Sequence, residues 1–421
     1  MAKLDFLQGM KVVDLSTFVA APVCAKILGE YGAEVIRVEP KIGDSVRYVA
    51  RQVVGVTNGD NPFYDTVNGN KRQICVDTRR PEGLAVLHRL LEQADVFVCN
   101  MRADQAARSG LDWESVHAKY PRIVYANVTG YGTKGPFAGR AGFDNTAFYS
   151  RTGLNSAGQE PDQPPAASYT GIGDIPTGTY LAMGVIAAYV KALRTGQGEF
   201  VTASLYASGM WSEVYPVTFA QAPYHDKYPK PREARLLLTQ NYQDCDGRWF
   251  TLNTGNWEKD WPKLGRGLGL DEDLVSRTSR LNDAMPVHQT LYELVRDAFL
   301  QAPYAHWDPL LIELDISHDL CQTYAEVITD PVAIGADLLQ PVRYETSGSE
   351  INLVRSPVQF GMGPAETELA RKVGQDTLDV LKEYGYTDGE IAALRTGGVV
   401  GVMGDPDVYD GTWASKFGKG T

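Results

Sequence analysis

The sequence predicts an α/β protein with a doubly wound parallel sheet in a large domain and a smaller α+β domain beside it. Short apolar runs alternate with helical patterns through the first 130 residues. The first strand–helix–strand repeat is short, and crossovers of this kind build parallel sheets. The chain has 421 residues, which is enough for two or three domains.

The first β-α-β unit comprises three segments. Lys11–Leu15 is an apolar run typical of a strand, and Glu34–Val38 is the next one. Between them, Pro22–Tyr31 carries apolar residues at four-residue spacing, which predicts a helix. Its proline suits a first helical position, and Gly32 suits the position just after the end.

The same alternation continues to the middle of the chain. It predicts further strands at Gln73–Val76, Asp95–Cys99 and Arg122–Ala126, a helix that begins at Pro81, and an apolar helix over Thr179–Arg194. Residues 131–180 are rich in glycine and proline, as functional loops often are. We therefore assign residues 1–225 to the first part of a large Rossmann-like domain.

A small domain is expected at residues 235–330. Asp244–Arg248 has the composition of a hairpin turn, and helical patterns follow over Asp283–Phe299 and Asp308–Ile316. The last segment, residues 331–421, carries helical patterns over Gln375–Tyr384 and Asp388–Arg395. We expect this segment to return to the large domain.

Composition excludes several classes of function. The chain has 40 Lys and Arg against 52 Asp and Glu, a net charge of −12, which disfavours general nucleic-acid binding. No apolar run is long enough to span a membrane, and the first residues lack a signal peptide, so a cytoplasmic location is expected. The five cysteines and six histidines show no metal-ligand spacing, so no metal site is expected.

The turn after the first strand bears on the choice of ligand. It reads Ser16–Pro22 and contains no glycine-rich GxGxxG motif. A dinucleotide needs that motif for the close approach of its pyrophosphate to the backbone. The sequence therefore disfavours a dehydrogenase.

The main candidate for catalysis is Asp174, which lies in the glycine-flanked segment Gly171–Gly178 just before a predicted helix. Free backbone N–H groups and the helix dipole favour a negative charge there, which would keep the carboxylate ionised. An ionised carboxylate can attack an activated carbonyl. The alternative is that Asp174 is simply a helix N-cap, since Asp is a favoured residue at that position.

A second candidate site is basic. Several Lys and Arg residues lie beyond the carboxyl ends of predicted strands, where open α/β sheets bind ligands. They suit phosphate groups, and the alternative is that they are solvated surface charges. The residues of this basic rim are Lys71, Arg72, Arg102, Arg108, Lys134 and Arg140, with Asn70, Asn100 and Met101 beside them.

These motifs, in this order, resemble the class III CoA-transferases, a family that includes formyl-CoA transferase and carnitine CoA-transferase. The resemblance covers nearly the whole chain. It is carried by Val12–Leu15, Pro22, Gly29–Glu39, Asn70–Arg72, Asn100, Tyr131–Gly132, Gly135–Phe137, Gly142–Asp144, Gly173–Asp174 and the tail segments Gly374–Tyr386 and Ala392–Val400. The resemblance implies acyl-CoA and a carboxylic acid as substrates, no permanently bound cofactor, and an interlocked homodimer.

The resemblance also implies a mechanism and a set of site residues. Asp174 matches the nucleophile, which forms an acyl anhydride and then an aspartyl-CoA thioester, and Asp144 matches a supporting acid. Lys71, Asn100 and Arg108 match residues that contact CoA, and Val19 and Ala20 match the stretch beside the reacting thioester. The passage from Asn61 to Lys71 is similar to family members that act on aromatic or branched 2-hydroxy acids.

Two departures from the family pattern stand out. Val19 stands where formyl-CoA transferase has a glutamine. The run of glycines that this family member uses as a mobile loop is absent, and Asn253–Asn256 follow the predicted hairpin instead. Both changes point to a different substrate. Two alternatives to transferase activity stay open: a 2-methylacyl-CoA racemase, which Phe143 disfavours because the racemases carry their histidine base there, and a non-catalytic subunit of a heteromeric transferase.

Overall fold

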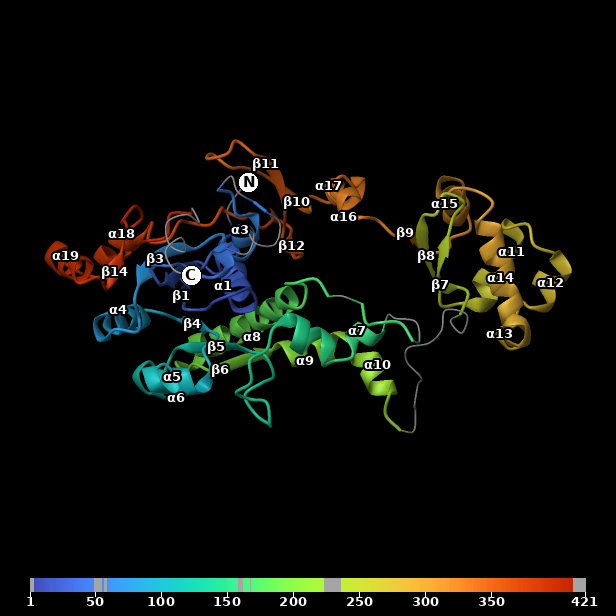
Figure 1. Cartoon of the computed structure of the whole chain (residues 1–421). Coiled ribbons are helices and arrows are strands. Elements are labelled where there is room, and N and C mark those ends of the chain that lie inside the picture. The colour runs from blue at the N-terminus through green and yellow to red at the C-terminus, as the bar shows by residue number, and fades with distance from the viewer. Residues whose placement is uncertain are drawn as a thin grey trace. The chain divides into compact units, whose positions relative to one another are not determined.

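The computed structural model describes residues 4–48, 55–56, 59–157, 162–166, 168–222 and 236–411. The chain divides into two compact units. The first comprises Met1–Asn155, Ala167–Thr218 and Pro331–Thr421, and the second comprises Ser156–Ala166 and Phe219–Asp330 (Figure 1).

The first unit is built on a seven-stranded sheet in the order β14-β3-β2-β1-β4-β5-β6. Strands β1 to β6 run parallel, and β14 pairs antiparallel with β3 at one edge. The strands are β1 (Lys11–Asp14), β2 (Glu34–Glu39), β3 (Arg72–Val76), β4 (Val96–Cys99), β5 (Val124–Thr129), β6 (Phe200–Ser204) and β14 (Val400–Gly401). This architecture confirms the predicted α/β class with a large parallel sheet.

Both faces of this sheet are covered, because successive strand residues alternate between two apolar clusters. Val12 and Val96 belong to one cluster with the helices α1 (Ala20–Glu30) and α8 (Asp174–Thr195). Val13 and Phe97 belong to the other cluster, beneath α4 (Pro81–Leu91), α18 (Thr377–Glu383) and α19 (Asp388–Thr396). All eleven residues of α1 are buried, so this helix is the centre of the first layer.

The remaining elements of the first unit are short. The helices are α3 (Pro62–Asn68), α5 (Ala103–Ser109), α6 (Trp113–Lys119), the π-helix η1 (Asp144–Ser150), α7 (Leu154–Ala157), α9 (Leu205–Ser212), α10 (Val214–Phe219) and α17 (Pro331–Gly335). Two small antiparallel pairs join β10 (Leu339–Arg343) to β11 (Glu350–Val354), and β12 (Gln359–Phe360) to β13 (Gly363–Pro364).

The second unit packs helices on a three-stranded antiparallel sheet in the order β7-β8-β9. The predicted hairpin at Asp244–Arg248 is confirmed, because β7 and β8 flank it and pair antiparallel. The elements are β7 (Thr239–Gln243), β8 (Trp249–Asn253), α11 (Trp257–Gly267), α12 (Glu272–Arg277), α13 (Leu281–Ala284), η3 (Met285–Val287), α14 (His288–Phe299), α15 (Tyr304–Glu313), β9 (His318–Leu320) and α16 (Tyr324–Val327).

The five strands predicted in the first half of the sequence are all present, with no end displaced by more than three residues. The strand β6 was not predicted from the sequence, although Phe200–Ser204 pairs with β5 along its whole length. The helix predicted from Thr179 begins five residues earlier, since α8 starts at Asp174. In the described part of the chain, no helix combines the length and apolarity that a bilayer crossing requires.

Candidate active site

The sheet order reverses between β1 and β4, which is where open α/β sheets bind ligands. One residue bridges the two strand ends. The amide of Asn100, just after β4, accepts from the backbone N–H of Thr17 at 3.0 Å and donates to the Thr17 carbonyl at 2.8 Å. The loop after β1 is therefore fixed at the crevice, and that loop leads directly into α1.

Two helices begin at this same edge. Both α1 and α8 follow parallel strands and return along one face of the sheet, so their amino ends both lie at its carboxyl edge. They pack very closely, because a Cβ added to Gly178 would lie 2.3 Å from the carbonyl oxygen of Ala20. Asp174 lies one turn before Gly178 on α8, so its carboxylate is placed beside the start of α1.

Asp174 is the first residue of α8 and does not cap it. Gly173 occupies the N-cap position, and among the described residues none donates a hydrogen bond to the Asp174 carboxylate. The N-cap alternative is therefore wrong. Burial, followed by the charge of Asp144, raises the pKa of Asp174 to about 7. These two effects outweigh the helix terminus, so it does not hold the pKa at its ordinary value and Asp174 is only partly ionised at neutral pH.

Asp144 supports the loop that carries Asp174. It is buried at the start of η1, and its carboxylate accepts from the backbone N–H of Gly171 at 2.5 Å and of Asn145 at 2.8 Å. Gly173 packs against the ring of Phe148 from the same π-helix, with no room for a side chain. η1 therefore fixes the turn from Gly171 to Asp174, and it brings the two carboxylates near each other.

A buried network of ion pairs lies behind the crevice. Arg37 contacts Asp14 at 2.8 Å and Asp44 at 2.6 Å, and Arg47 contacts Glu39 at 2.8 Å. Asp14 also pairs with Lys71, so three carboxylates face three cations without net charge. Buried charges are tolerated when they are paired in this way. The network holds the loop after β1, because Asp14 accepts from Ser16 and Asp44 accepts from Phe18.

This network overturns part of the predicted basic rim. The Lys71 side chain is fully buried, and its ammonium group donates to Asp14, Asn68 and two backbone carbonyls. Arg72 lies at the amino end of β3, the opposite edge of the sheet, where it pairs with Glu34 and Glu383. The prediction that these two residues form a phosphate-binding rim is wrong. The sequence showed that they are cationic and did not show which way they point.

The other predicted ligand residues occupy different surroundings. The Asn70 amide holds the C-terminal segment by bonds to the backbone at Glu366 and Glu368. Arg108 is exposed on α5 and paired with Asp104 at 3.0 Å. Arg140 is exposed beside the ring of Phe137. The last three are Val19, Ala20 and Met101: the first two are buried at the start of α1, and Met101 packs against the core behind β4.

Two features of the site escaped the sequence analysis. The first is Phe18, whose backbone has φ of +65°. The second is the buried ion-pair network. One signal pointed to the network: Arg37 and Glu39 interrupt the apolar strand β2, and a charged residue inside such a run must find a partner.

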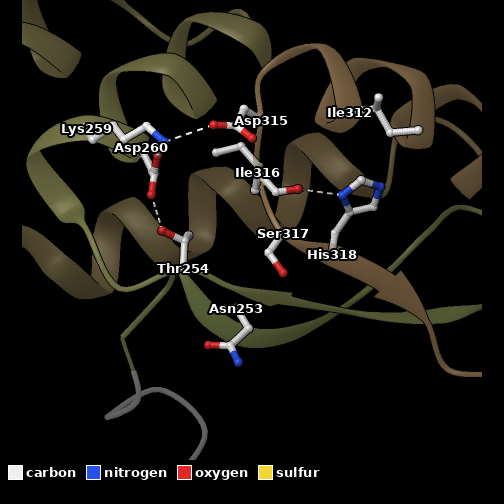
Figure 2. Close-up of a pocket in the computed structure, with 9 residues that line it drawn as sticks. All are labelled: Asn253, Thr254, Lys259, Asp260, Ile312, Asp315, Ile316, Ser317 and His318. Atoms are coloured by element: carbon white, nitrogen blue, oxygen red, sulfur yellow. Dashed lines mark hydrogen bonds and ion pairs between the residues drawn. The ribbon is translucent and has the colours of Figure 1, made fainter. Parts of the chain in front are cut away.

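A groove of about 470 Å³ lies in the second unit (Figure 2). Its charged groups contact one another, because the Lys259 ammonium pairs with Asp315 at 2.9 Å and the Thr254 hydroxyl donates to Asp260. Asn253 and Thr254 belong to the segment Asn253–Asn256 that follows the hairpin. None of the predicted site residues lines this groove. Among the described residues, no cluster of three His, Cys, Asp or Glu side chains could hold a metal ion.

Comparison with known proteins identifies the family. The family model of CoA-transferase family III matches residues 7–377. The chain belongs to CoA-transferase family III. It is a CoA-transferase, an enzyme that uses a CoA thioester and a carboxylic acid as substrates. The family resemblance predicted from the sequence motifs is therefore confirmed.

Relatives and solved structures agree with this family. The chain is 35% identical to (R)-2-hydroxy-4-methylpentanoate CoA-transferase of Clostridioides difficile, over 94% of this chain and 99% of that protein. It is 33% identical to cinnamoyl-CoA:phenyllactate CoA-transferase of Clostridium sporogenes, over 93% and 96%. The crystal structure of a CaiB/BaiF family protein from Brucella suis matches with a TM-score of 0.74 at 25% identity, over 90% and 99%.

Proposed function

We propose that this CoA-transferase works by covalent catalysis at Asp174. The observation that carries the proposal is the state of this carboxylate. It lies at the amino end of α8, it has no hydrogen-bond donor among the described residues, and its pKa is raised to about 7. A carboxylate without hydrogen bonds keeps its lone pairs available, so it is a better nucleophile than one held in a cap.

Each half of the reaction has two steps. The ionised Asp174 oxygen attacks the thioester carbonyl of the donor, the C–S bond breaks, and CoA leaves as a thiolate from a mixed anhydride. The thiolate then attacks the aspartyl carbonyl, which gives an aspartyl-CoA thioester and frees the donor acid. The acceptor carboxylate repeats these steps in reverse. One thioester replaces another, so the exchange is nearly balanced in free energy.

The backbone at the start of α1 suits the charge that develops in these steps. An oxyanion forms on the acyl carbonyl in every attack, and free N–H groups at a helix amino end stabilise it. Val19 and Ala20 are at this position, and Val19 has no side-chain amide to add. We propose that Asp144 has a positioning role, because it holds Gly171 and its charge raises the pKa of Asp174.

For the substrate, we propose a 2-hydroxy acid with a branched or aromatic side chain. The support is the identity to two transferases named for acids of this kind. CoA would lie across the carboxyl edge of the sheet near Asn100, with Arg108 and Arg140 as the remaining cationic candidates for its phosphates. We further propose an interlocked homodimer located in the cytoplasm, in keeping with five free cysteines.

The decisive experiment combines a variant with direct detection of the intermediate. Asp174→Asn is nearly isosteric and should abolish CoA exchange between acetyl-CoA and 2-hydroxy-4-methylpentanoate, measured by mass spectrometry of the thioesters. Hydroxylamine added during turnover should modify the wild-type peptide that contains residue 174. Asp388→Asn, at the first position of the exposed helix α19, is the matched control and should keep full activity. Full exchange by Asp174→Asn would refute the mechanism.

The same assay distinguishes the two alternatives. A racemase would exchange the substrate α-proton in deuterated water, whereas the proposed transferase leaves that proton in place. A non-catalytic subunit would show no exchange of either kind until a partner chain is added. Sedimentation at micromolar concentration tests the homodimer directly, and a monomeric species would contradict it.

A further inference from the structure

The backbone at Phe18 is unusual for its residue type. Phe18 has φ of +65°, in the left-handed region that side chains with a Cβ rarely adopt. The other four described non-glycine residues with positive φ are of types that tolerate this region: Asn70, Asp162, Asp315 and Asp337. A bulky residue in this conformation persists only where the surrounding structure holds it, and such outliers are common at functional sites.

The surrounding structure holds this turn from both sides. The Phe18 N–H donates to the carboxylate of Asp44 at 3.1 Å, and Asp44 is itself fixed by Arg37 at 2.6 Å. The preceding residue, Thr17, is held by Asn100. The strained conformation is therefore imposed by the buried ion-pair network and by the residue that bridges β1 and β4.

This conformation brings the Phe18 ring against a second aromatic ring. The Phe18 ring meets the ring of Phe143 edge to face, with centroids 5.3 Å apart and an interplanar angle of 77°. Phe18 precedes the start of α1, and Phe143 precedes Asp144, so the pair joins the two segments that border Asp174. The two residues remain 43% and 55% exposed, so each keeps a face open for another apolar group.

Two more apolar side chains flank the nucleophile itself. Ile172 and Ile175, which precede and follow Asp174 in the sequence, are 48% and 38% exposed. These aliphatic side chains and the aromatic pair are therefore exposed apolar groups on the segments that adjoin Asp174. Contact between this apolar surface and a hydrocarbon side chain of the substrate buries area and contributes favourable binding free energy. Contact with a methyl group buries little area and contributes little.

We propose that Phe18 and Phe143 are specificity-determining residues that select acids with a branched aliphatic or aromatic side chain. This inference rests on the proposed attack by Asp174 and adds the residues that contact the remainder of the acid. Phe143 thereby has a role of its own, in place of the proton abstraction that a histidine would perform at this position.

The test compares two acceptor acids, 2-hydroxy-4-methylpentanoate and lactate, with acetyl-CoA as donor. The wild type should prefer the six-carbon acid in kcat/KM. Phe143→Ala should lower kcat/KM for that acid on the order of 10- to 100-fold, as loss of apolar contacts does, and change the value for lactate by less than about threefold. Phe18→Gly removes the other ring, suits positive φ and should reduce the preference in the same way.

Phe6→Ala is the matched control. Phe6 is 50% exposed and pairs with Phe360 at 4.5 Å, but it lies beside the carboxyl end of α1, at the opposite edge of the sheet. Its loss should leave the preference unchanged. Two outcomes would overturn the inference and leave the transferase mechanism intact. One is a wild-type enzyme that prefers lactate, and the other is a preference for 2-hydroxy-4-methylpentanoate that survives in both Phe143→Ala and Phe18→Gly. Failure of the wild type to use either acid would overturn both.

Discussion

Asp174→Asn should stabilise the folded protein at alkaline pH while it abolishes activity. The folded pKa of Asp174 is about 7, against an ordinary value of 3.8. Between these pH values the folded protein binds a proton that the unfolded chain has released, so the free energy of unfolding falls as the pH rises. The asparagine variant has no such proton, and its advantage over the wild type should grow across this range.

The magnitude follows from the size of the shift. From pH 5 to pH 7 the wild type loses up to about 2.7 kcal/mol at about 1.36 kcal/mol per pH unit. Asp174 is partly exposed, and water screening reduces this to about 1–2 kcal/mol. Well above pH 7 the difference should be constant, since both folded and unfolded carboxylates are then ionised.

Urea unfolding of both proteins at pH 5 and pH 8, followed by circular dichroism, measures this difference. Asp388→Asn is again the control, because Asp388 occupies the same position in its helix and is exposed. Its effect should be a few tenths of a kcal/mol at either pH. An advantage of Asp174→Asn that is the same at pH 5 and pH 8 would show that burial and Asp144 do not raise this pKa.

Three further predictions concern the surroundings of Asp174. The kcat/KM should fall at pH values below an apparent pKa of about 7, since the nucleophile must be ionised. Asp144→Asn should move this acidic limb of the kcat/KM profile to lower pH. An unmoved limb would show that Asp144 does not raise the pKa of Asp174. Gly178→Ala should lower the free energy of unfolding by about 1–3 kcal/mol and reduce kcat, because the added methyl group forces α1 and α8 apart. Gly389→Ala is the control, since Gly389 has open space around it, and it should leave the thermal unfolding temperature unchanged. Arg108→Ala should raise KM for acyl-CoA and leave kcat nearly unchanged; an unchanged KM would make Arg108 ordinary surface.

The sequence by itself determined the order of the main elements. Apolar periodicity located β1 to β5 and α1, because burial of one face of a helix or both faces of a strand constrains local residue choice. Turn composition located the hairpin of the second unit. The strand β6 escaped, since its residues are only partly buried and its pattern is weak. Short sequence motifs predicted the family and the candidate nucleophile, because such motifs consist of a reactive residue and its immediate neighbours in the sequence.

Only the tertiary structure decided the surroundings of those residues. Lys71 and Arg108 are both cationic, and the sequence does not distinguish them. Lys71 is buried in an ion-pair network, whereas Arg108 is exposed to solvent. The pKa of Asp174 depends on burial and on Asp144, which is distant in the sequence, and no local rule reports either. The pairing of Phe18 with Phe143 arises in the same way. Each of these properties is set by contacts between distant segments, and such contacts exist only once the sheet and its covering helices have formed.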